Sequence, residues 1–309
     1  MGLVAVGGAR EAICSGAVPR EPCLAWSLLP PAAMRHRPSL PEYQAQLSSF
    51  HAAFERELEA IVGRLPLDPD MRVLDLACGD GFYAGRIARR LGPRGAVVGA
   101  DVNSSYLRDA GKNAARVPGG PTIDFVDASF DALPFPDEAF DLVWCAQSLY
   151  TLPDPVVVLG HALRVLRPGG LVAVLENDTL HQVFLPWPAH FELPLRTAEL
   201  RAFAERSRNS SKYYVGRRLL AVLAKAGFEP LAMTTHAFDR HAPLGEAERA
   251  LLQSYLEDVR DRVASYLETR LFEELRELVD PTSPKHLLGQ PHLTMTWLNV
   301  LALGRKPNA

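Results

Sequence analysis

The chain has 309 residues, of which 48% are hydrophobic and 22% are charged, and its formal net charge is −3. This composition suits a globular protein with a sizeable core, and it gives no overall positive field that would attract nucleic acid. No apolar run approaches the roughly 20 residues that a membrane span requires, and the first residues lack the basic and apolar regions of a signal peptide. We therefore expect a cytoplasmic protein with no membrane span and no nucleic-acid partner.

The four cysteines are Cys14, Cys23, Cys78 and Cys145, and none of them forms a CxxC pair. Zinc sites and redox motifs use such short pairs, and small secreted scaffolds use regular cysteine frameworks. A reducing compartment fits this pattern better than a disulfide scaffold. The sequence therefore calls for no metal.

Residues 1–37 are rich in Gly, Pro and Ala and show neither a helical nor a strand period. We interpret this segment as disordered, or as an extension upstream of a true start at Met34. Organised sequence follows it, and we treat residues 38–309 as a single domain.

An amphipathic helix is expected over residues 39–64, ahead of the first strand. Pro41 suits the first turn of a helix, and apolar residues then recur at three- and four-residue steps from Tyr43 to Ile61. Its place before the first strand makes it a lid for whatever the sheet binds.

Strands and helices then alternate along the chain. The expected strands cover residues 72–76, 96–100, 123–127, 142–145 and 171–176, and the expected helices between them cover 82–91, 104–116 and 155–166. This alternation predicts an α/β fold with a parallel sheet and helices on both faces.

The alternation continues once more and then breaks. A helix over 216–226 ends at Gly227 and leads into a strand over 230–235. Residues 245–291 form a helical insertion before the last buried strand, 296–303. The insertion carries an apolar stripe at helical spacing: Leu251, Leu252, Tyr255, Val259, Val263, Leu267 and Leu271.

The most informative motif is the run from Asp75 to Gly81, Asp-Leu-Ala-Cys-Gly-Asp-Gly, after the first strand. Its glycines, Gly79 and Gly81, let the backbone turn sharply and approach a ligand closely. The next helix presents its N-terminus at the same place. Taken alone, the run fits a tight strand-to-helix turn as well as a ligand site.

Three further features stand at matching distances. Asp101 ends the second strand 20 residues after Gly81, where a carboxylate can accept both hydroxyls of a ribose. Asp127 ends the third strand, and the turn Arg167-Pro168-Gly169-Gly170 precedes the fifth.

Together these motifs resemble the class I S-adenosylmethionine-dependent methyltransferases, especially the branch with ubiquinone- and menaquinone-biosynthesis enzymes and many natural-product methyltransferases. The resemblance is close over residues 71–170, including the link 127–143, and looser up to the last strand. It implies a Rossmann-like, seven-stranded, mostly parallel sheet with an antiparallel last strand and helical cap elements. It also implies S-adenosyl-L-methionine as the cofactor.

The resemblance assigns cofactor contacts to ten residues in or just after the first four strands: Asp75, Ala77, Cys78, Gly79, Gly81, Asp101, Val102, Asp127, Ala128 and Gln147. The run 75–81 would line the pocket for the amino-acid end of the cofactor. Asp101 would take the ribose hydroxyls, and residues 102, 127 and 128 would surround the adenine. Gln147 would lie beside the methionine portion.

A nicotinamide-dependent oxidoreductase is the competing interpretation, because residues 79–84 satisfy the G-x-G-x-x-A pattern. Asp75 argues against it, since a carboxylate there suits an ammonium group and would repel a pyrophosphate. A catalytically inactive S-adenosylmethionine-binding protein is the other alternative, and the motifs do not separate it from an enzyme.

The acceptor is expected beyond the carboxyl ends of the strands, between the lid helix, the segment 177–195 and the insertion 245–291. The aromatic content of these segments favours a small hydrophobic or aromatic molecule over a macromolecule. The residues expected to line this pocket are Tyr43, Tyr150, Phe184, Trp187 and His190.

Methyl transfer is an in-line displacement, in which alignment supplies roughly 7–11 kcal/mol of the barrier reduction. A hydroxyl acceptor would gain about 10²–10⁴-fold from a general base. His181, which closely follows the fifth strand, is the candidate base, with His190 and Tyr150 as the other candidates and a plain surface role as the alternative. The insertion would cap the pocket or form a homodimer surface, and the acceptor atom (oxygen, nitrogen or carbon) is left open.

Overall fold

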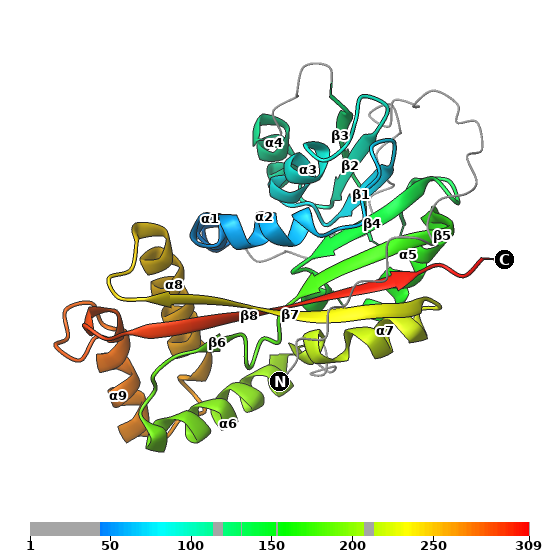
Figure 1. Ribbon diagram of the computed structural model, residues 1–309. Coiled ribbons are helices and arrows are strands. Elements are labelled where there is room, and N and C mark those ends of the chain that lie inside the picture. The colour runs from blue at the N-terminus through cyan, green and yellow to red at the C-terminus, as the bar shows by residue number, and fades with distance from the viewer. Residues whose placement is uncertain (1–43, 114–119, 131, 153, 207–212, 309) are drawn as a thin grey trace, which may run out of the picture.

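A computed structural model describes residues 44–113, 120–130, 132–152, 154–206 and 213–308. Its centre is an eight-stranded sheet in the order β3-β2-β1-β4-β5-β8-β6, with β7 paired to β8 (Figure 1). The predictions for residues 1–37 and for Tyr43 fall outside the described residues.

The first five strands are parallel, as predicted. They are β1 (Arg72–Leu76), β2 (Ala96–Asp101), β3 (Thr122–Asp127), β4 (Phe140–Ala146) and β5 (Leu166–Glu176). The helices that connect or follow them are α3 (Phe82–Ala88), α4 (Ser104–Asn113) and α5 (Pro155–Val165), with the single turn η2 (Leu149–Thr151) after β4. Every residue of β4 is buried, which explains its continuous apolar sequence.

The sheet is completed by a long hairpin of β7 (Glu229–His241) and β8 (Thr294–Arg305). β8 runs antiparallel to both β5 and β7, which confirms the predicted antiparallel last strand. The hairpin extends well beyond the end of β5, and there the two-residue strand β6 (Val183–Phe184) pairs with β8. The sheet therefore has eight strands rather than seven, because two residues are too few to show an alternating pattern.

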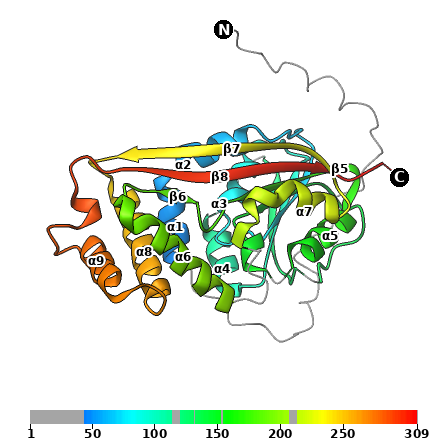
Figure 2. The same ribbon diagram turned by 90° about the horizontal axis from the view of Figure 1, so that it is seen from below.

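Helices cover both faces of this sheet, because alternate residues of its strands pack in two separate core clusters with different helices. Figure 2 shows α1, α6, α8 and α9 beneath one half of the β7–β8 hairpin and α5 and α7 beneath the other. The remaining helices are α1 (Gln44–Ala53), α2 (Glu55–Gly63), α6 (Ala189–Arg206), α7 (Leu219–Lys225), α8 (Glu246–Val263) and α9 (Thr269–Val279). Two single helical turns, η4 (Gly216–Arg218) and η5 (Leu287–Gly289), complete the described elements.

Two of these cap helices differ from the prediction. The lid helix is divided at Phe54, whose backbone leaves the helical region at φ −125° and ψ 24°. Helix α6 was not predicted, because Pro194 interrupts its sequence and its apolar residues do not follow a clear helical stripe. The insertion between β7 and β8 is helical, as predicted.

Trp297 of β8 joins the cap helices to the sheet. Its ring centroid lies 5.4 Å from that of Phe50 in α1 and 5.8 Å from that of Tyr255 in α8. Aromatic pairs of this kind contribute about 0.5–1.5 kcal/mol each beyond area burial. All three residues are buried, so α1 and α8 are packed against the strand hairpin.

Within the described parts of the chain, no helix is long and apolar enough to cross a membrane.

Candidate active site

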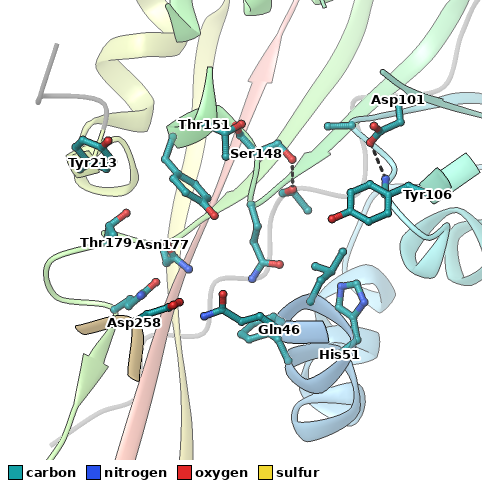
Figure 3. Close-up of a pocket in the computed structure, with 18 of the residues that line it drawn as sticks. Gln46, His51, Asp101, Tyr106, Ser148, Thr151, Asn177, Thr179, Tyr213 and Asp258 are labelled. Atoms are coloured by element: carbon teal, nitrogen blue, oxygen red, sulfur yellow. Dashed lines mark hydrogen bonds between the residues drawn. The ribbon is translucent and has the colours of Figure 1, made fainter. Parts of the chain in front are cut away.

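A cavity of about 300 Å³ lies between the carboxyl ends of the parallel strands and the helices α1, α6 and α8. One part, which we call the glycine-loop half, is lined by Ala77, Cys78, Gly79, Asp101, Val102, Tyr106 and Gln147. The other part, the cap half, is lined by Gln46, Tyr150, Asn177, Thr179, Gln182, Phe203, Arg206, Tyr213, Asp258, Arg262 and Trp297. Figure 3 shows residues of both parts around one continuous space.

Residues 77–81, between β1 and α3, form what we call the glycine loop, and it contains residues with positive φ. Ala77 has φ 63° and Gly79 has φ 51°, and the backbone N–H groups of Ala77 and Cys78 both donate to the carbonyl of Ala100, at 2.8 and 3.1 Å. This holds the loop against the end of β2. Both Ala77 and Gly79 line the cavity, so the backbone itself forms part of its wall.

Gly81 has a different task from the one predicted. It precedes α3 with φ 78° and does not line the cavity. A Cβ atom there would lie 3.0 Å from the Cβ of Ala110 in α4. Gly81 therefore allows α3 and α4 to approach each other closely behind the loop.

Asp101 is held in place by two backbone N–H groups. Its Oδ2 accepts from Gly79 at 3.0 Å (Figure 3), and its Oδ1 accepts from Asn103 at 2.8 Å. A carboxylate oxygen can accept more than one hydrogen bond, so both oxygens can still receive hydroxyl groups from the cavity. Burial raises the pKa of this carboxyl, although the bonds from Asn103 and Gly79 oppose that shift.

Asp75 lies beneath the loop and does not line the cavity. Burial, with the nearby charge of Asp101 as the second cause, raises the pKa of Asp75 to about 8. Its Oδ2 atom has no hydrogen-bond partner. Two buried carboxyls at this place disfavour a phosphate and favour a ligand that carries positive charge.

A second turn with positive φ follows β4, at Gln147 with φ 51°. Glu176, at the end of β5, holds this turn, because its Oε1 accepts from the N–H of Ser148 at 2.7 Å and of Leu149 at 2.5 Å. Burial raises the pKa of Glu176 to about 8. The sequence analysis missed this role, although an acid that ends a buried strand was the available signal.

His51 of α1 was also missed. It lines the cavity and stacks on Phe82 at 3.8 Å between ring centroids, and its Nδ1 lies 3.7 Å from Oδ1 of Asp80 in the glycine loop. Burial lowers the pKa of this histidine, while the nearby carboxylate of Asp80 raises it. His51 thus docks the lid helix directly on the glycine loop.

The cap half is braced by a buried ion network. Glu199 of α6 accepts from Arg196 at 2.8 Å and from Arg262 of α8 at 2.9 Å. Breaking a buried ion pair by removing one partner typically costs about 3–5 kcal/mol. The network therefore fixes α8 on α6, and Arg262 presents part of its side chain to the cavity.

The structure places four predicted acceptor-side residues outside the cavity lining. His181 is exposed, and Phe184 of β6 is 54% exposed. Trp187 is buried against Phe191, at 5.5 Å between ring centroids, and His190 pairs with Glu274 of α9 at 3.0 Å. The pairing of β6 with β8 directs this segment along the outside of the cap, which corrects the placement expected from its nearness to β5.

Of the predicted cofactor residues, Asp127 and Ala128 also lie off the cavity lining. Ala128 is buried in the core, and its N–H donates to the carbonyl of Asp101 at 3.0 Å. Phe130, two residues further on, lines the cavity in their place. No group of three or more metal-ligating side chains occurs among the described residues.

Comparison with known proteins identifies the family of this site. A family described as a methyltransferase domain matches residues 73–170. The 27-O-demethylrifamycin SV methyltransferase of Amycolatopsis mediterranei (strain S699) is 32% identical over 231 residues, which are 73% of this chain and 77% of that protein. The chain belongs to the class I S-adenosylmethionine-dependent methyltransferases. S-adenosylmethionine is therefore the cofactor of this methyltransferase, and the nicotinamide interpretation is excluded.

Other relatives match less of the chain. The ubiquinone/menaquinone biosynthesis C-methyltransferase UbiE of Hahella chejuensis is 46% identical over 105 residues, and the chain spans only 42% of its length. A crystal structure of a candidate methyltransferase from Bacillus halodurans C-125 has a TM-score of 0.51 and 21% identity, and the match covers 81% of this chain and 99% of that one. The latter similarity supports the fold alone.

The residues of the glycine-loop half fit the cofactor of this family. Asp101 offers two carboxylate oxygens for ribose hydroxyls, and Val102 offers an apolar contact beside it. The buried carboxyls of Asp75 and Asp101 suit the positive charge of a sulfonium and an ammonium group. Residues that would hold the cofactor are thus Ala77, Gly79, Asp101 and Val102.

Proposed function

We propose that this methyltransferase methylates a small molecule with hydrophobic or aromatic parts, bound in the cap half of the cavity. The supporting observation is the continuity of the two halves. Residues that fit the cofactor and residues of the cap helices line one space, so donor and acceptor can meet inside it. S-adenosylmethionine, when bound, supplies the methyl group as an electrophile on sulfur.

The protein's own contribution is alignment and exclusion of water. Helix α1 extends over the glycine loop through His51, and Leu47 and Phe50 of the same helix line the cavity. Correct alignment of two reactants supplies roughly 7–11 kcal/mol of barrier reduction. We infer that the lid helix and α8 together hold the acceptor in line with the donor and keep solvent out.

The lining of the cap half supports the proposed acceptor class. Aromatic side chains of Tyr150, Phe203, Tyr213 and Trp297 alternate with amide and hydroxyl groups. Such a mixture suits a small molecule with an aromatic or apolar body and several oxygen functions. One relative named above is a methyltransferase of ubiquinone/menaquinone biosynthesis and another is a 27-O-demethylrifamycin SV methyltransferase, and quinones and rifamycins are molecules of this kind.

Titration calorimetry followed by an acceptor screen tests the proposal. We expect S-adenosylmethionine to bind, and a panel of phenols, quinols, amines and hydroxylated polyketides to contain compounds that gain the mass of one methyl group. Binding without any product would favour an inactive cofactor-binding protein. Failure to bind S-adenosylmethionine would contradict the cofactor assignment of the site.

A further inference from the structure

We propose that the acceptor atom is a hydroxyl oxygen, and that Asp258 of α8 is the catalytic base that removes its proton. Asn177 and Thr179 would position this hydroxyl. The inference rests on the proposed function and adds to it the acceptor chemistry and a base that differs from His181.

The cap half contains buried polar atoms that the protein itself leaves without partners. Asn177 is 7% exposed and Thr179 is 9% exposed, and neither Oδ1 of Asn177 nor Oγ1 of Thr179 has a hydrogen-bond partner. Both residues line the cavity just after β5. A buried unsatisfied group costs about 1–3 kcal/mol, and a ligand that bonds to it recovers part of that free energy. These atoms therefore mark a place built for a polar group of the acceptor.

Asp258 stands beside the same place. Figure 3 shows its carboxylate near Asn177 and Gln46 and across the cavity from Asp101. The Gln46 side chain of α1 lies beside the Asp258 carboxylate (Figure 3). An amide can satisfy only part of a carboxylate, so Asp258 retains capacity to accept a hydroxyl proton. Asn177 and Thr179 offer further hydrogen bonds to such a hydroxyl but cannot act as bases.

The charges around Asp258 suit a base that is stronger than an ordinary aspartate. Partial loss of solvent raises the pKa of Asp258, and Asp261 and Glu257 on the same helix raise it further, while Arg262 and the Gln46 amide lower it. The other titratable or charged residues that line the cavity are His51, Cys78, Tyr83, Asp101, Tyr106, Tyr150, Arg206 and Tyr213. The carboxylate is thus more basic than an ordinary aspartate.

The step balances without a further reactant. The acceptor O–H bond breaks and its proton moves to a carboxylate oxygen of Asp258. The oxygen's electron pair forms the new bond to the methyl carbon, and the carbon–sulfur bond of the donor breaks, leaving a neutral thioether. Solvent then takes the proton from Asp258 when the products leave the open cavity.

The test compares Asp258→Asn with the matched control Asp261→Asn. Asp261 lies on the same helix, pairs with Arg260 at the surface, and does not line the cavity. With hydroxyl acceptors identified in the screen, we expect Asp258→Asn to lower kcat about 10²–10⁴-fold, since this is the usual contribution of a general base. Asp261→Asn removes only one of the smaller charges that raise the pKa of Asp258, so its rate should stay within about 2-fold of the wild type. Both variants should bind S-adenosylmethionine as the wild type does.

A series of naphthols with decreasing hydroxyl pKa separates proton removal from a structural role. The decrease of kcat caused by Asp258→Asn should become smaller along the series and vanish for acceptors that are already ionised, because these need no base. In the wild type, kcat should fall at acid pH, as Asp258 becomes protonated, and this limb should be absent in Asp258→Asn.

Three results would overturn the inference while leaving the proposed function intact. One is wild-type turnover by Asp258→Asn with a weakly acidic hydroxyl. Another is a decrease of kcat in Asp258→Asn that is equal along the whole naphthol series. The third is methylation of amines or carbon atoms but of no hydroxyl. Cofactor binding by the wild type without any methylated product would instead remove the proposed function itself.

Discussion

The two halves of the cavity are built in opposite ways. The glycine-loop half comes from strand ends within residues 77–147, and its central carboxylate, Asp101, is held by backbone N–H groups at 2.8 and 3.0 Å. The cap half brings together residues as distant in sequence as Gln46 and Trp297, and it leaves Asn177 Oδ1 and Thr179 Oγ1 without partners.

This difference separates two kinds of ligand. The glycine-loop half concentrates the carboxyls of Asp75 and Asp101, which favours a cation. The cap half combines aromatic rings, amides and the single carboxylate of Asp258 with arginines, which favours a largely neutral oxygenated molecule. Substitutions in one half should therefore change the affinity for the cofactor, and those in the other half should change the use of the acceptor.

The largest effect on cofactor binding is expected for Asp101→Asn. The change removes the charge that would bond to two ribose hydroxyls, and a hydrogen bond to a charged group contributes about 1.5–3 kcal/mol. The Kd of S-adenosylmethionine should rise by about 100-fold, measured by titration calorimetry. Asp70→Asn, which removes a surface pair with Arg94, is the control and should leave the Kd unchanged.

Thr179→Val tests the comparison in the cap half of the cavity. Removing an unsatisfied buried hydroxyl should raise the free energy of unfolding of the ligand-free protein by about 1 kcal/mol, measured by chemical denaturation. The KM of the acceptor should rise about 5–20-fold because one hydrogen bond is lost. Thr197→Val in α6, whose hydroxyl bonds to the Leu193 carbonyl, is the control, and a similar rise of KM there would speak against a specific contact.

The buried acid beneath the glycine loop should make cofactor binding depend on pH. Asp75 has its pKa raised to about 8, so it is mostly protonated in the free protein at pH 7. A bound cation lowers that pKa, and binding should release protons, detected by calorimetry in buffers of different ionisation enthalpy. Asp75→Asn should abolish the release, and an unchanged release would exclude Asp75 as its source.

The same raised pKa also affects stability. A carboxyl with a raised folded-state pKa stabilises the fold most below its unfolded pKa, and this contribution is lost as pH rises towards about 8, both for Asp75 and for Glu176. The ligand-free protein should therefore unfold more easily at pH 9 than at pH 6, with a smaller difference in Asp75→Asn. Denaturant titrations at the two pH values measure this.

The smallest effect is expected for His181→Ala. His181 is exposed and lies outside the cavity lining, so kcat and the acceptor KM should stay within about 2-fold of the wild type. A large loss of kcat in steady-state assays would restore it as a candidate base.

The sequence predicted the first half of the molecule well because its signals are local. Each strand of the parallel sheet has its own apolar run, and the glycines and Asp101 stand at fixed distances along the chain. The strand at residues 72–76 and the start of α3 at Phe82 are found at the predicted residues.

The cap could not be predicted in the same way, because its site depends on contacts between distant segments. Asp258 faces Gln46 only because α8 packs on α1, and no local pattern in either helix shows that pairing. His181 was predicted as the base for its nearness to β5 along the chain, but it is exposed and lies outside the cavity lining, as His190 does. Secondary structure was thus more accessible from the sequence than the acceptor site.

Titration of S-adenosylmethionine into Asp101→Asn and Thr179→Val, beside the wild type, tests the division of the cavity most directly. We predict that Asp101→Asn weakens cofactor binding by about 100-fold and that Thr179→Val binds as the wild type does while its acceptor KM rises. Equal weakening of cofactor binding in the two variants, or wild-type affinity in Asp101→Asn, would contradict the assignment of donor and acceptor to separate halves.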